Sequence, residues 1–355
     1  MKKKVRLLII GPLPPPAGGV SIHIIRLIEL LQNDYDIDVI DESFLFKKQY
    51  FNFRSGNLFK YLNKILRSDV VFIHSGNHTF KKLHLIISKC FFKKTIVTFH
   101  GFGHKRKDKK FGFWERFIYR QSDKIIFVNK AIQSNLIFAN NKCIVKHAFL
   151  PPIMSFEPEL PSIISEWIKQ ARSQNQTIIC SNASRLNIYN NQDLYGLDMC
   201  IEVVERLLKK GININLIFIV SSVEVGNDKF EEAKEKLRIL GLTNNFLLLN
   251  NKLSFVKLIE QSDIVVRPTN TDGDALTIRE AIFLHKPVLA SDVVVRPEGT
   301  YTFKTRDIND FELKLMTLIT LNATHSLNKE KDINEYSAFY QNLISSLVTK
   351  NSNTK

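Results

Sequence analysis

Short apolar segments alternate with helix-like segments along most of this chain, and this alternation is the feature that most restricts its fold. Residues 5–11 have the composition of a buried strand, and residues 19–32 carry apolar side chains at helical spacing. Further strands are expected at residues 37–41, 69–75, 95–101, 124–129 and 143–149, and helices at 57–67, 79–91, 112–121 and 130–138. Apolar strands joined through helices pair in parallel with both faces covered, so the pattern predicts a doubly wound α/β sheet.

A proline-rich segment, LPPIMSFEPELP at residues 150–161, interrupts the alternation, which then starts again. Strands are expected at residues 177–184, 214–222, 245–250, 263–268 and 287–292, and helices within 194–210 and at 228–240, 254–261 and 275–284. At 355 residues the chain is long enough for two cores. We therefore expect two Rossmann-like doubly wound parallel-sheet domains with an interdomain cleft. The boundaries expected are 1–150 for the first domain, 151–161 for a linker, 162–330 for the second domain, and 331–355 for a closing helix (332–347) and tail.

The join between the first strand and the first helix, GPLPPPAGGVSIH at residues 11–23, has an unusual composition. The prolines at 14–16 cannot enter a helix interior, whereas Gly18 and Gly19 allow backbone angles and close approaches that a Cβ would forbid. A helix that begins with N–H groups free of side chains suits an anion, usually phosphate. An ordinary strand-to-helix loop with Ser21 near the cap is an equal alternative on this stretch alone.

A second polar loop follows a strand within residues 267–292, RPTNTDGDALTIREAIFLHKPVLASD. Asp272 lies in the loop, and Glu280 lies just over one turn inside the helix that follows. The loop offers backbone N–H groups to an anion, and each carboxylate can accept hydrogen bonds from sugar hydroxyls. Because carboxylates repel a phosphate unless they bind hydroxyls, the pairing indicates a nucleotide sugar more than a bare nucleotide.

This window resembles the E-x7-E motif of retaining GT-B glycosyltransferases, particularly the family 4 group, with Asp272 in place of the first Glu and Glu280 as the second. The segment at residues 11–23 looks like the glycine turn of that family. TFHG at residues 98–101 matches its strand-end histidine, and SNASRL at residues 181–186 matches the strand end that carries its phosphate-binding arginine. The motifs occur in the family's order and extend from residue 9 to about residue 300.

The resemblance implies a catalytic set of His100, Arg185 and Glu280. Glu280 would hold the ribose of the donor, Arg185 would neutralise the diphosphate leaving group, and His100 would lie beside the donor sugar and the acceptor. The implied donor-binding residues are Gly18, Gly19, Arg185, Asp272, Gly273, Asp274, Ala275, Leu276, Thr277 and Glu280. Similar enzymes retain the anomeric configuration without a protein-bound metal, so no cofactor other than the donor substrate is expected.

The sequence departs from the family pattern at two positions. Tyr195-Gly196 stands where the family usually has Lys-Gly, so the second phosphate-binding cation is missing there. Arg267, Arg279 and Arg296 are the candidates to replace it. The Asp at position 272 is shorter than Glu by one methylene, which leaves the donor sugar open.

The charge of the chain favours an acidic partner, because its formal net charge is +15. Five basic clusters fall before residue 120, and the last of them, HKRKDKKFGFWERF at residues 104–117, interleaves basic with aromatic residues. This pattern suits an anionic membrane surface or nucleic acid. No apolar run of about 18 residues and no signal-peptide pattern occurs. We expect a cytoplasmic protein that is peripheral at the inner face of the cell membrane, with no nucleic-acid partner.

These observations predict a retaining glycosyltransferase of bacterial surface polysaccharide biosynthesis, such as capsule, exopolysaccharide or lipopolysaccharide, with a lipid-linked or saccharide acceptor. Two alternatives stay open, namely a nucleotide-sugar 2-epimerase of the same fold and a non-catalytic basic protein that binds a membrane or nucleic acid. The D-x-D pattern at 272–274 also matches the metal motif of GT-A enzymes, but two Rossmann-like halves argue against that fold.

The remaining histidines and the cysteines show no metal-ligand pattern in the sequence. We expect His74, His78, His84 and His104 to be surface or acceptor-side residues. The four cysteines lack a C-x-x-C pair and are expected to be small core residues.

Overall fold

A computed structural model describes the chain over residues 4–15, 18–101, 111–128, 130, 132–133, 141–222, 228–321 and 333–348. The chain divides into two compact units. One, here the N-terminal unit, comprises Met1–Pro151 with Lys331–Lys355, and the other, the C-terminal unit, comprises Pro152–Glu330.

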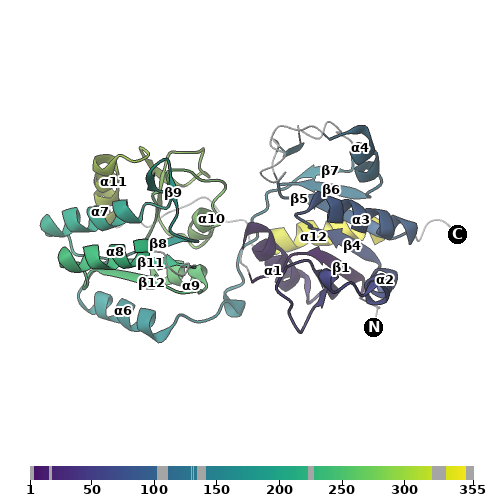
Figure 1. Cartoon of the computed structure of the whole chain (residues 1–355), viewed down its shortest axis with the longest axis horizontal. Coiled ribbons are helices and arrows are strands. Elements are labelled where there is room, and N and C mark those ends of the chain that lie inside the picture. The colour runs from purple at the N-terminus through teal and green to yellow at the C-terminus, as the bar shows by residue number, and fades with distance from the viewer. Residues whose placement is uncertain are drawn as a thin grey trace. The chain divides into compact units, whose positions relative to one another are not determined.

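The N-terminal unit contains a seven-stranded parallel sheet in the order β3-β2-β1-β4-β5-β6-β7 among its described residues (Figure 1). Its strands are β1 (Arg6–Gly11), β2 (Asp36–Asp41), β3 (Phe51–Asn52), β4 (Val70–Ile73), β5 (Lys94–Phe99), β6 (Lys124–Phe127) and β7 (Cys143–Val145). Its helices are α1 (Gly19–Leu31), α2 (Leu58–Arg67), α3 (His78–Cys90), α4 (Phe113–Arg120) and α12 (Ile333–Val348), with a 3-10 turn at Phe53–Ser55.

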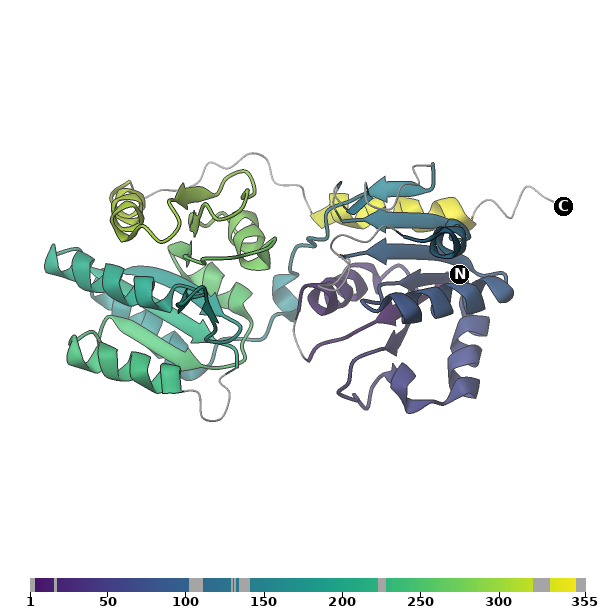
Figure 2. The same cartoon turned by 45° about the horizontal axis from the view of Figure 1, so that its top comes forward.

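Alternate side chains of each strand enter the two cores of this unit, as the two-residue period of a strand requires. Leu8 and Ile10 of β1 join the core under α2, α3 and α4. Leu7 and Ile9 join the core under α1 and α12 on the opposite face. Figures 1 and 2 both show α12, in yellow, against the strands of this unit, so the end of the chain completes the N-terminal core.

The C-terminal unit contains a six-stranded parallel sheet in the order β12-β11-β8-β13-β14-β15 within the described part of the chain. Its strands are β8 (Thr177–Ala183), β11 (Ile214–Val220), β12 (Phe246–Asn250), β13 (Ile264–Arg267), β14 (Val288–Ser291) and β15 (Tyr301–Phe303), with a small antiparallel hairpin of β9 (Ile188–Tyr189) and β10 (Gln192–Asp193). Its helices are α6 (Ser162–Ser173), α7 (Leu197–Lys209), α8 (Asp228–Ile239), α9 (Phe255–Gln261), α10 (Leu276–Phe283) and α11 (Ile308–Thr320), with a 3-10 turn at Met154–Phe156.

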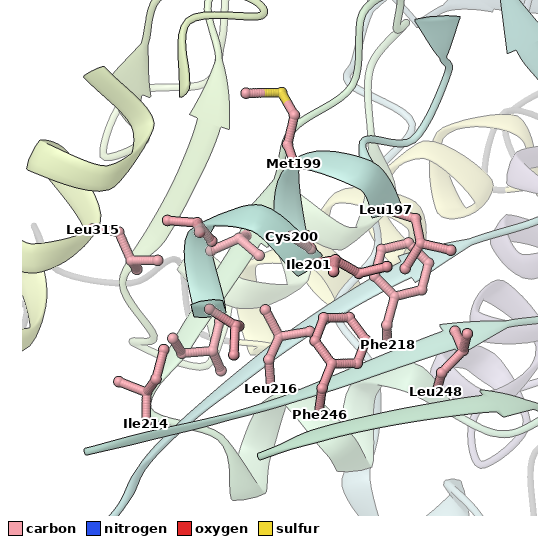
Figure 3. Packing of buried hydrophobic residues seen from close by; sticks show 14 of the residues in the cluster. Leu197, Met199, Cys200, Ile201, Ile214, Leu216, Phe218, Phe246, Leu248 and Leu315 are labelled. Atoms are coloured by element: carbon pink, nitrogen blue, oxygen red, sulfur yellow. The ribbon is translucent and has the colours of Figure 1, made fainter. Parts of the chain in front are cut away.

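Both faces of the C-terminal sheet are covered by helices. Leu216 and Phe218 of β11 enter the core under α7, α8 and α11, where Figure 3 shows Leu197 and Ile201 of α7 above them. Ile217, on the other side of the same strand, packs in the core with α6, α9 and α10. The expected doubly wound sheets are therefore confirmed in both units.

The strand order is the same in the two units when strands of each large sheet are numbered along the chain. It reads 3-2-1-4-5-6, with a seventh strand added in the N-terminal unit, and is typical of dinucleotide-binding folds. The order reverses between β1 and β4 and between β8 and β13. Ligands of such sheets bind outside the carboxyl ends of the strands at these reversals.

Several elements differ from the sequence prediction. The strands β3 and β15, the β9-β10 hairpin and the helices α6 and α11 were not expected. The expected helix at 130–138 lies almost wholly outside the described residues, as does the basic segment 104–110. Cys180 and Cys200 are buried as expected, but Cys90 is exposed, so the expectation that it is a core residue is wrong.

Candidate functional site

The carboxyl ends of β8, β13 and β14 bring together two sequence segments that were singled out above. Asn182 lies near the end of β8, Arg267 is the last residue of β13, and Ser291 is the last residue of β14. Because β8 and β13 flank the reversal in strand order, this edge is where the fold itself places a ligand site.

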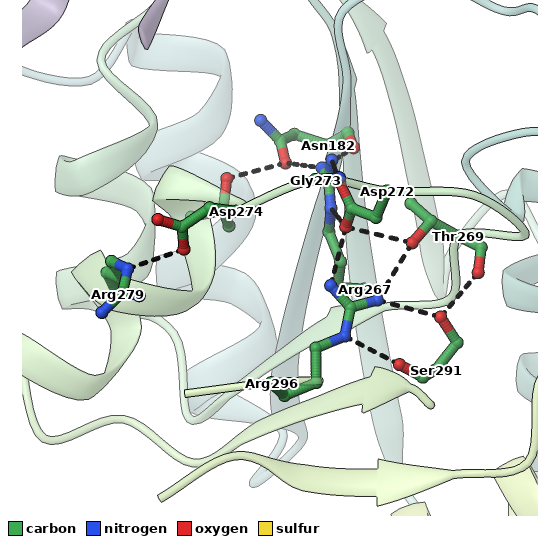
Figure 4. A network of polar contacts seen from close by, with 10 residues as sticks. Asn182, Arg267, Thr269, Asp272, Gly273, Asp274, Arg279, Ser291 and Arg296 are labelled. Carbon is green, nitrogen blue, oxygen red and sulfur yellow. Dashed lines mark hydrogen bonds and ion pairs between the residues drawn. The ribbon is translucent and has the colours of Figure 1, made fainter. Parts of the chain in front are cut away.

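Asp272 is the centre of a polar network at this edge (Figure 4). Its carboxylate accepts hydrogen bonds from Nε and Nη2 of Arg267 at 3.2 and 3.3 Å and from Nη1 of Arg296 at 2.9 Å. The hydroxyl of Thr269 and the backbone N–H of Gly273 donate to the same carboxylate. Burial alone would raise the pKa of Asp272, but Arg267 and Arg296 outweigh it and hold that pKa below its usual value. Asp272 is therefore ionised and fixes both guanidinium groups.

Each of these arginines has a second anchor at a strand end. Nη1 of Arg267 donates to the backbone oxygen and to Oδ1 of Asn182 at 3.4 and 3.3 Å. Nε of Arg296 donates to the backbone oxygen of Ser291 at 2.8 Å. The side chains of Arg267 and Arg296 are 12% and 3% exposed. Two positive charges are thus held in defined positions before any ligand binds.

Helix α10 begins directly after this network. Ala275 is its N-cap in an extended conformation, and no side chain among the described residues caps the helix. The Thr277 hydroxyl donates to Oδ1 of Asn182 at 3.2 Å, which ties the first turn to β8. Arg279 pairs with Asp274 at 2.7 Å on a more exposed face. The N–H groups of the first turn, from Leu276 onwards, add a partial positive charge to the edge.

The two catalytic residues expected in this unit lie on different elements. Glu280 is in the middle of α10 and is 4% exposed. Arg185 lies two residues beyond β8 and is exposed. The structure therefore places one carboxylate inside the helix and one cation in the loop after β8, and their roles stay predictions.

Tyr195 and Gly196 precede α7, where the family pattern has Lys-Gly. Gly196 has φ 71°, in the left-handed region, and a Cβ there would lie 2.3 Å from the backbone oxygen of Pro268. The guanidinium of Arg267 lies 5.2 Å from the centre of the Tyr195 ring. A cation from β13 is therefore present beside the position where the family lysine is absent.

The glycine turn of the N-terminal unit differs from expectation in its backbone. Gly18 is the N-cap of α1 with φ −159°, and neither Gly18 nor Gly19 has a positive φ. The expectation of special backbone angles is therefore wrong. No described atom outside the neighbouring residues lies within 4 Å of a Cβ built at Gly19, and the Gly18 N–H donates to the Ser21 hydroxyl, which donates to the Gly18 oxygen. Ser21 lies near the cap, as the loop alternative expects, and the space at Gly19 leaves the donor-binding role of Gly18 and Gly19 a prediction.

His100 follows β5 and contacts two other histidines. His74, which follows β4, has its Nδ1 3.1 Å from Nε2 of His100, and the ring of His23 on α1 packs on both. Burial lowers the pKa of His23 to about 4 and lowers those of His74 and His100 well below the usual value. All three rings are neutral at pH 7. His74 and His84 are fully buried, so the surface alternative is wrong for both and the acceptor-side alternative stays a prediction; His78 is half-buried, and His104 lies outside the described residues.

A second buried network that the sequence did not indicate lies at the same edge of the N-terminal unit. Oε1 of Glu42 accepts hydrogen bonds from the Ser75 hydroxyl at 2.6 Å and from Nε2 of His84 at 2.9 Å, and Tyr61 contacts the other nitrogen of His84 at 2.8 Å. Glu42 also lines a hollow of about 400 Å³ beside the start of α1. The sequence could have indicated Glu42 through its position directly after β2, because that strand ends at the same edge of the sheet.

Comparison with known proteins addresses the fold. No protein-family profile matches the chain, and no curated protein matches its sequence. The Anabaena protein HepE, solved with UDP and glucose, matches with a TM-score of 0.63 at 16% identity over 96% of this chain and 100% of that one. A glycosyltransferase from Rickettsia africae matches with a TM-score of 0.63 at 15% identity over 99% and 100%.

A sucrose-phosphate synthase from Thermosynechococcus elongatus has a TM-score of 0.57 at 12% identity, over 97% of this chain and 100% of that one. Together with the two parallel sheets, these matches confirm the expected two-domain α/β GT-B fold. Within the described residues, no helix combines the length and apolar character needed to cross a membrane.

Proposed function

We propose that this chain is a glycosyltransferase that transfers a sugar from a nucleoside diphosphate sugar to an acceptor with retention of the anomeric configuration. The observation that carries the proposal is the carboxyl edge of the C-terminal unit, where Arg267 and Arg296 are fixed beside the start of α10. Guanidinium groups and helix N–H groups suit a diphosphate. The UDP and UDP-glucose found in HepE support a UDP-sugar as the first donor class to test.

The donor-binding roles follow from chemistry at this edge. Glu280 accepts hydrogen bonds from the ribose hydroxyls, and the backbone from Gly273 to Thr277 binds the sugar and diphosphate. Asp272 acts through Arg267 and Arg296, since both arginines share its oxygens. The glycine turn contributes Gly18 and Gly19 to donor binding, and His100 lies beside the donor sugar and the acceptor.

The reaction breaks the bond between the anomeric carbon and the diphosphate oxygen. The acceptor hydroxyl oxygen bonds to the same carbon, and its proton leaves with the products. Negative charge grows on the departing diphosphate, so cations that are already in place stabilise the transition state more than the ground state. Arg185, together with the two buried arginines, supplies this stabilisation, and we propose no resident metal for the step.

We further propose that the enzyme is bacterial and works in surface polysaccharide assembly at the inner face of the cell membrane, on a lipid-linked or saccharide acceptor. The net charge of +15 supports attraction to anionic lipid. Helix α4 supports it as well, because Phe113, Trp114 and Phe117 are 68%, 71% and 51% exposed on one short element. Aromatic side chains of this kind favour the membrane interface.

The test is a transfer and hydrolysis screen over UDP-, GDP- and ADP-sugars, with and without membrane extract. We expect one donor class to give transfer, and Glu280→Gln and Arg185→Ala to lower kcat/KM by at least about a hundredfold. Glu231→Gln, at an exposed carboxylate on α8, is the matched control and should leave the rate unchanged. Epimerised donor without acceptor would indicate an epimerase, and salt-sensitive binding without turnover would indicate a binding protein. Either result would overturn the proposal.

A further inference from the structure

Three histidines from separate elements of the N-terminal unit meet at the carboxyl edge of its sheet. His23 lies on α1, and His74 and His100 directly follow β4 and β5. One ring nitrogen of each lies within 4.8 Å of the others. The ring centres are 4.8 to 5.4 Å apart, so the three imidazoles pack against one another.

The hydrogen bond of His23 leaves one of its ring nitrogens available to bind an ion. Its Nδ1 lies 2.6 Å from the backbone oxygen of Ala148, and because a carbonyl only accepts, Nδ1 carries the proton. Nε2 then holds a lone pair, and it is buried without a hydrogen-bond partner among the residues that the structure describes. A carbonyl that orients the distal N–H of a ligating histidine is the usual support of a metal site.

His74 and His100 already have the separation of two metal ligands. Their facing nitrogens are 3.1 Å apart, and two ligands of a tetrahedral zinc ion with bonds of 2.0–2.1 Å would be about 3.3 Å apart. For both facing nitrogens to ligate, His74 must carry its proton on Nε2, which is buried without a partner within the described part of the chain. Burial of the unpaired Nε2 of His23 also costs free energy, which binding of an ion at that nitrogen would offset.

We propose that His23, His74 and His100 form a binding site for one transition-metal ion, with Zn²⁺ as the expected occupant. Three imidazoles suit Zn²⁺, Ni²⁺ or Cu²⁺ and do not suit Mg²⁺ or Ca²⁺, which require oxygen ligands. Three protein ligands leave a fourth position for water or for an oxygen of a substrate.

Two cations near the cluster set a limit on its affinity. Lys81 donates from Nζ to the backbone oxygen of Thr98 at 2.9 Å, and Arg26 donates from Nη1 to that of Leu150 at 3.1 Å. Both are held by carbonyls, and the charge of Arg26, with that of Lys81 below its lowered pKa of about 7, opposes binding of a further cation. We therefore expect weaker binding than at sites whose histidines are supported by carboxylates.

The experiment titrates tag-free full-length protein with Co²⁺, followed by visible absorption, and with Zn²⁺ by calorimetry. We expect one ion per chain and the d–d bands of a four-coordinate nitrogen site. His23→Gln and His100→Gln should each lower the affinity at least about tenfold. His285→Gln, at an exposed histidine of the C-terminal unit, is the control and should bind as the wild type does.

Circular dichroism checks that each variant is folded. His100→Gln is the decisive variant, because His100 is partly exposed and its replacement disturbs the core less than replacement of the buried His23. The absence of d–d bands, an intense thiolate charge-transfer band, or equal losses in the three variants would overturn the site. The expected effect on activity rests on the proposed function. If His100 lies beside the donor sugar and the acceptor, an ion bound to it should inhibit sugar transfer. If Zn²⁺ binds but transfer is unchanged, the metal site stands and the role proposed for His100 fails.

Discussion

At the scale of single residues, Gly196 is a position where only glycine fits the observed backbone. Its φ of 71° is unfavourable for other residues, and a Cβ would lie 2.3 Å from the oxygen of Pro268. Gly196→Ala should therefore lower the free energy of unfolding by at least about 2 kcal/mol, measured by urea denaturation.

Gly241→Ala separates backbone strain from the steric clash. Gly241 has φ 69°, but a Cβ there meets no described atom within 4 Å. We expect a loss of about 1 kcal/mol at this position. Equal losses at Gly196 and Gly241 would show that contact with Pro268 is not what constrains Gly196.

Donor affinity should distinguish Arg267 from Arg279, two of the three arginines that could replace the missing family lysine. Arg267→Met should weaken UDP binding at least about tenfold, because a fixed, desolvated cation contributes more than an exposed one. Arg279→Met should have a smaller effect, since Arg279 is 27% exposed and paired with Asp274. Arg238→Met, on the surface of α8, should have none. Calorimetry with UDP measures all three, and a larger loss for Arg279→Met than for Arg267→Met would reverse the assignment.

The lowered pKa of Asp272 predicts a pH dependence of stability. A carboxyl whose folded pKa lies below its unfolded value stabilises the fold above the unfolded pKa of about 3.8 and loses this contribution as pH falls through the folded pKa. Asp272→Asn should thus lower the thermal midpoint most near pH 6, and the difference from wild type should shrink below about pH 4. A difference that stays constant over this range would contradict the role given to the Arg267 and Arg296 pairs.

Sequence reasoning located residues that lie in one continuous motif and missed those that depend on distant partners. Asp272 and Glu280 could be proposed from the sequence because a single strand-loop-helix segment carries both. His23 and His74 are 51 positions apart in the sequence. They come together only because β1 and β4, which precede them, are neighbours in the sheet. Spacing along the chain cannot show such a cluster.

At the scale of elements, the central strands were predicted because they are continuous apolar runs buried on both faces. The missed strands β3, β9, β10 and β15 have two or three residues each and lie at edges or outside the large sheets, where a periodic signal is too short to detect. Helix α6 did carry a signal, since Ile164, Ile168 and Ala171 are buried at helical spacing. The prolines before it favoured a linker and concealed its start.

Helix α12 should matter for the stability of the N-terminal unit although it comes from the far end of the chain. Ile344 is fully buried in the core that α1 and β1 share. Ile344→Ala should lower the free energy of unfolding by about 2–4 kcal/mol, followed by urea denaturation. Asn342→Ala, on the exposed side of the same helix, should change it by less than about 0.5 kcal/mol. Similar values for both variants would mean that α12 adds little to this core.

At the scale of the whole molecule, the GT-B fold was predictable because the alternation of strands and helices occurs twice around a proline-rich break. Parallel strands with helical connections admit few topologies, and right-handed crossovers reduce them further. The donor, the acceptor and the cellular role are not contained in that pattern. They depend on side chains at the strand ends and on the charge of the surface.

The surface charge leads to a prediction for the full-length protein. Unlike charges attract over a Debye length of about 8 Å at physiological salt. Apolar side chains that enter the membrane interface add a contribution to the binding free energy that salt does not screen. The protein should co-sediment with vesicles containing phosphatidylglycerol at low salt and dissociate progressively as salt rises.

Replacing both Phe113 and Trp114 by Ser should weaken binding severalfold at every salt concentration, because these exposed side chains supply the part of the binding free energy that salt does not screen. Leu313→Ser, at a residue 55% exposed in the C-terminal unit, controls for the loss of any exposed apolar group. Equal binding to neutral and anionic vesicles, or equal losses in the two variants, would remove α4 and the charge asymmetry as the basis of membrane association.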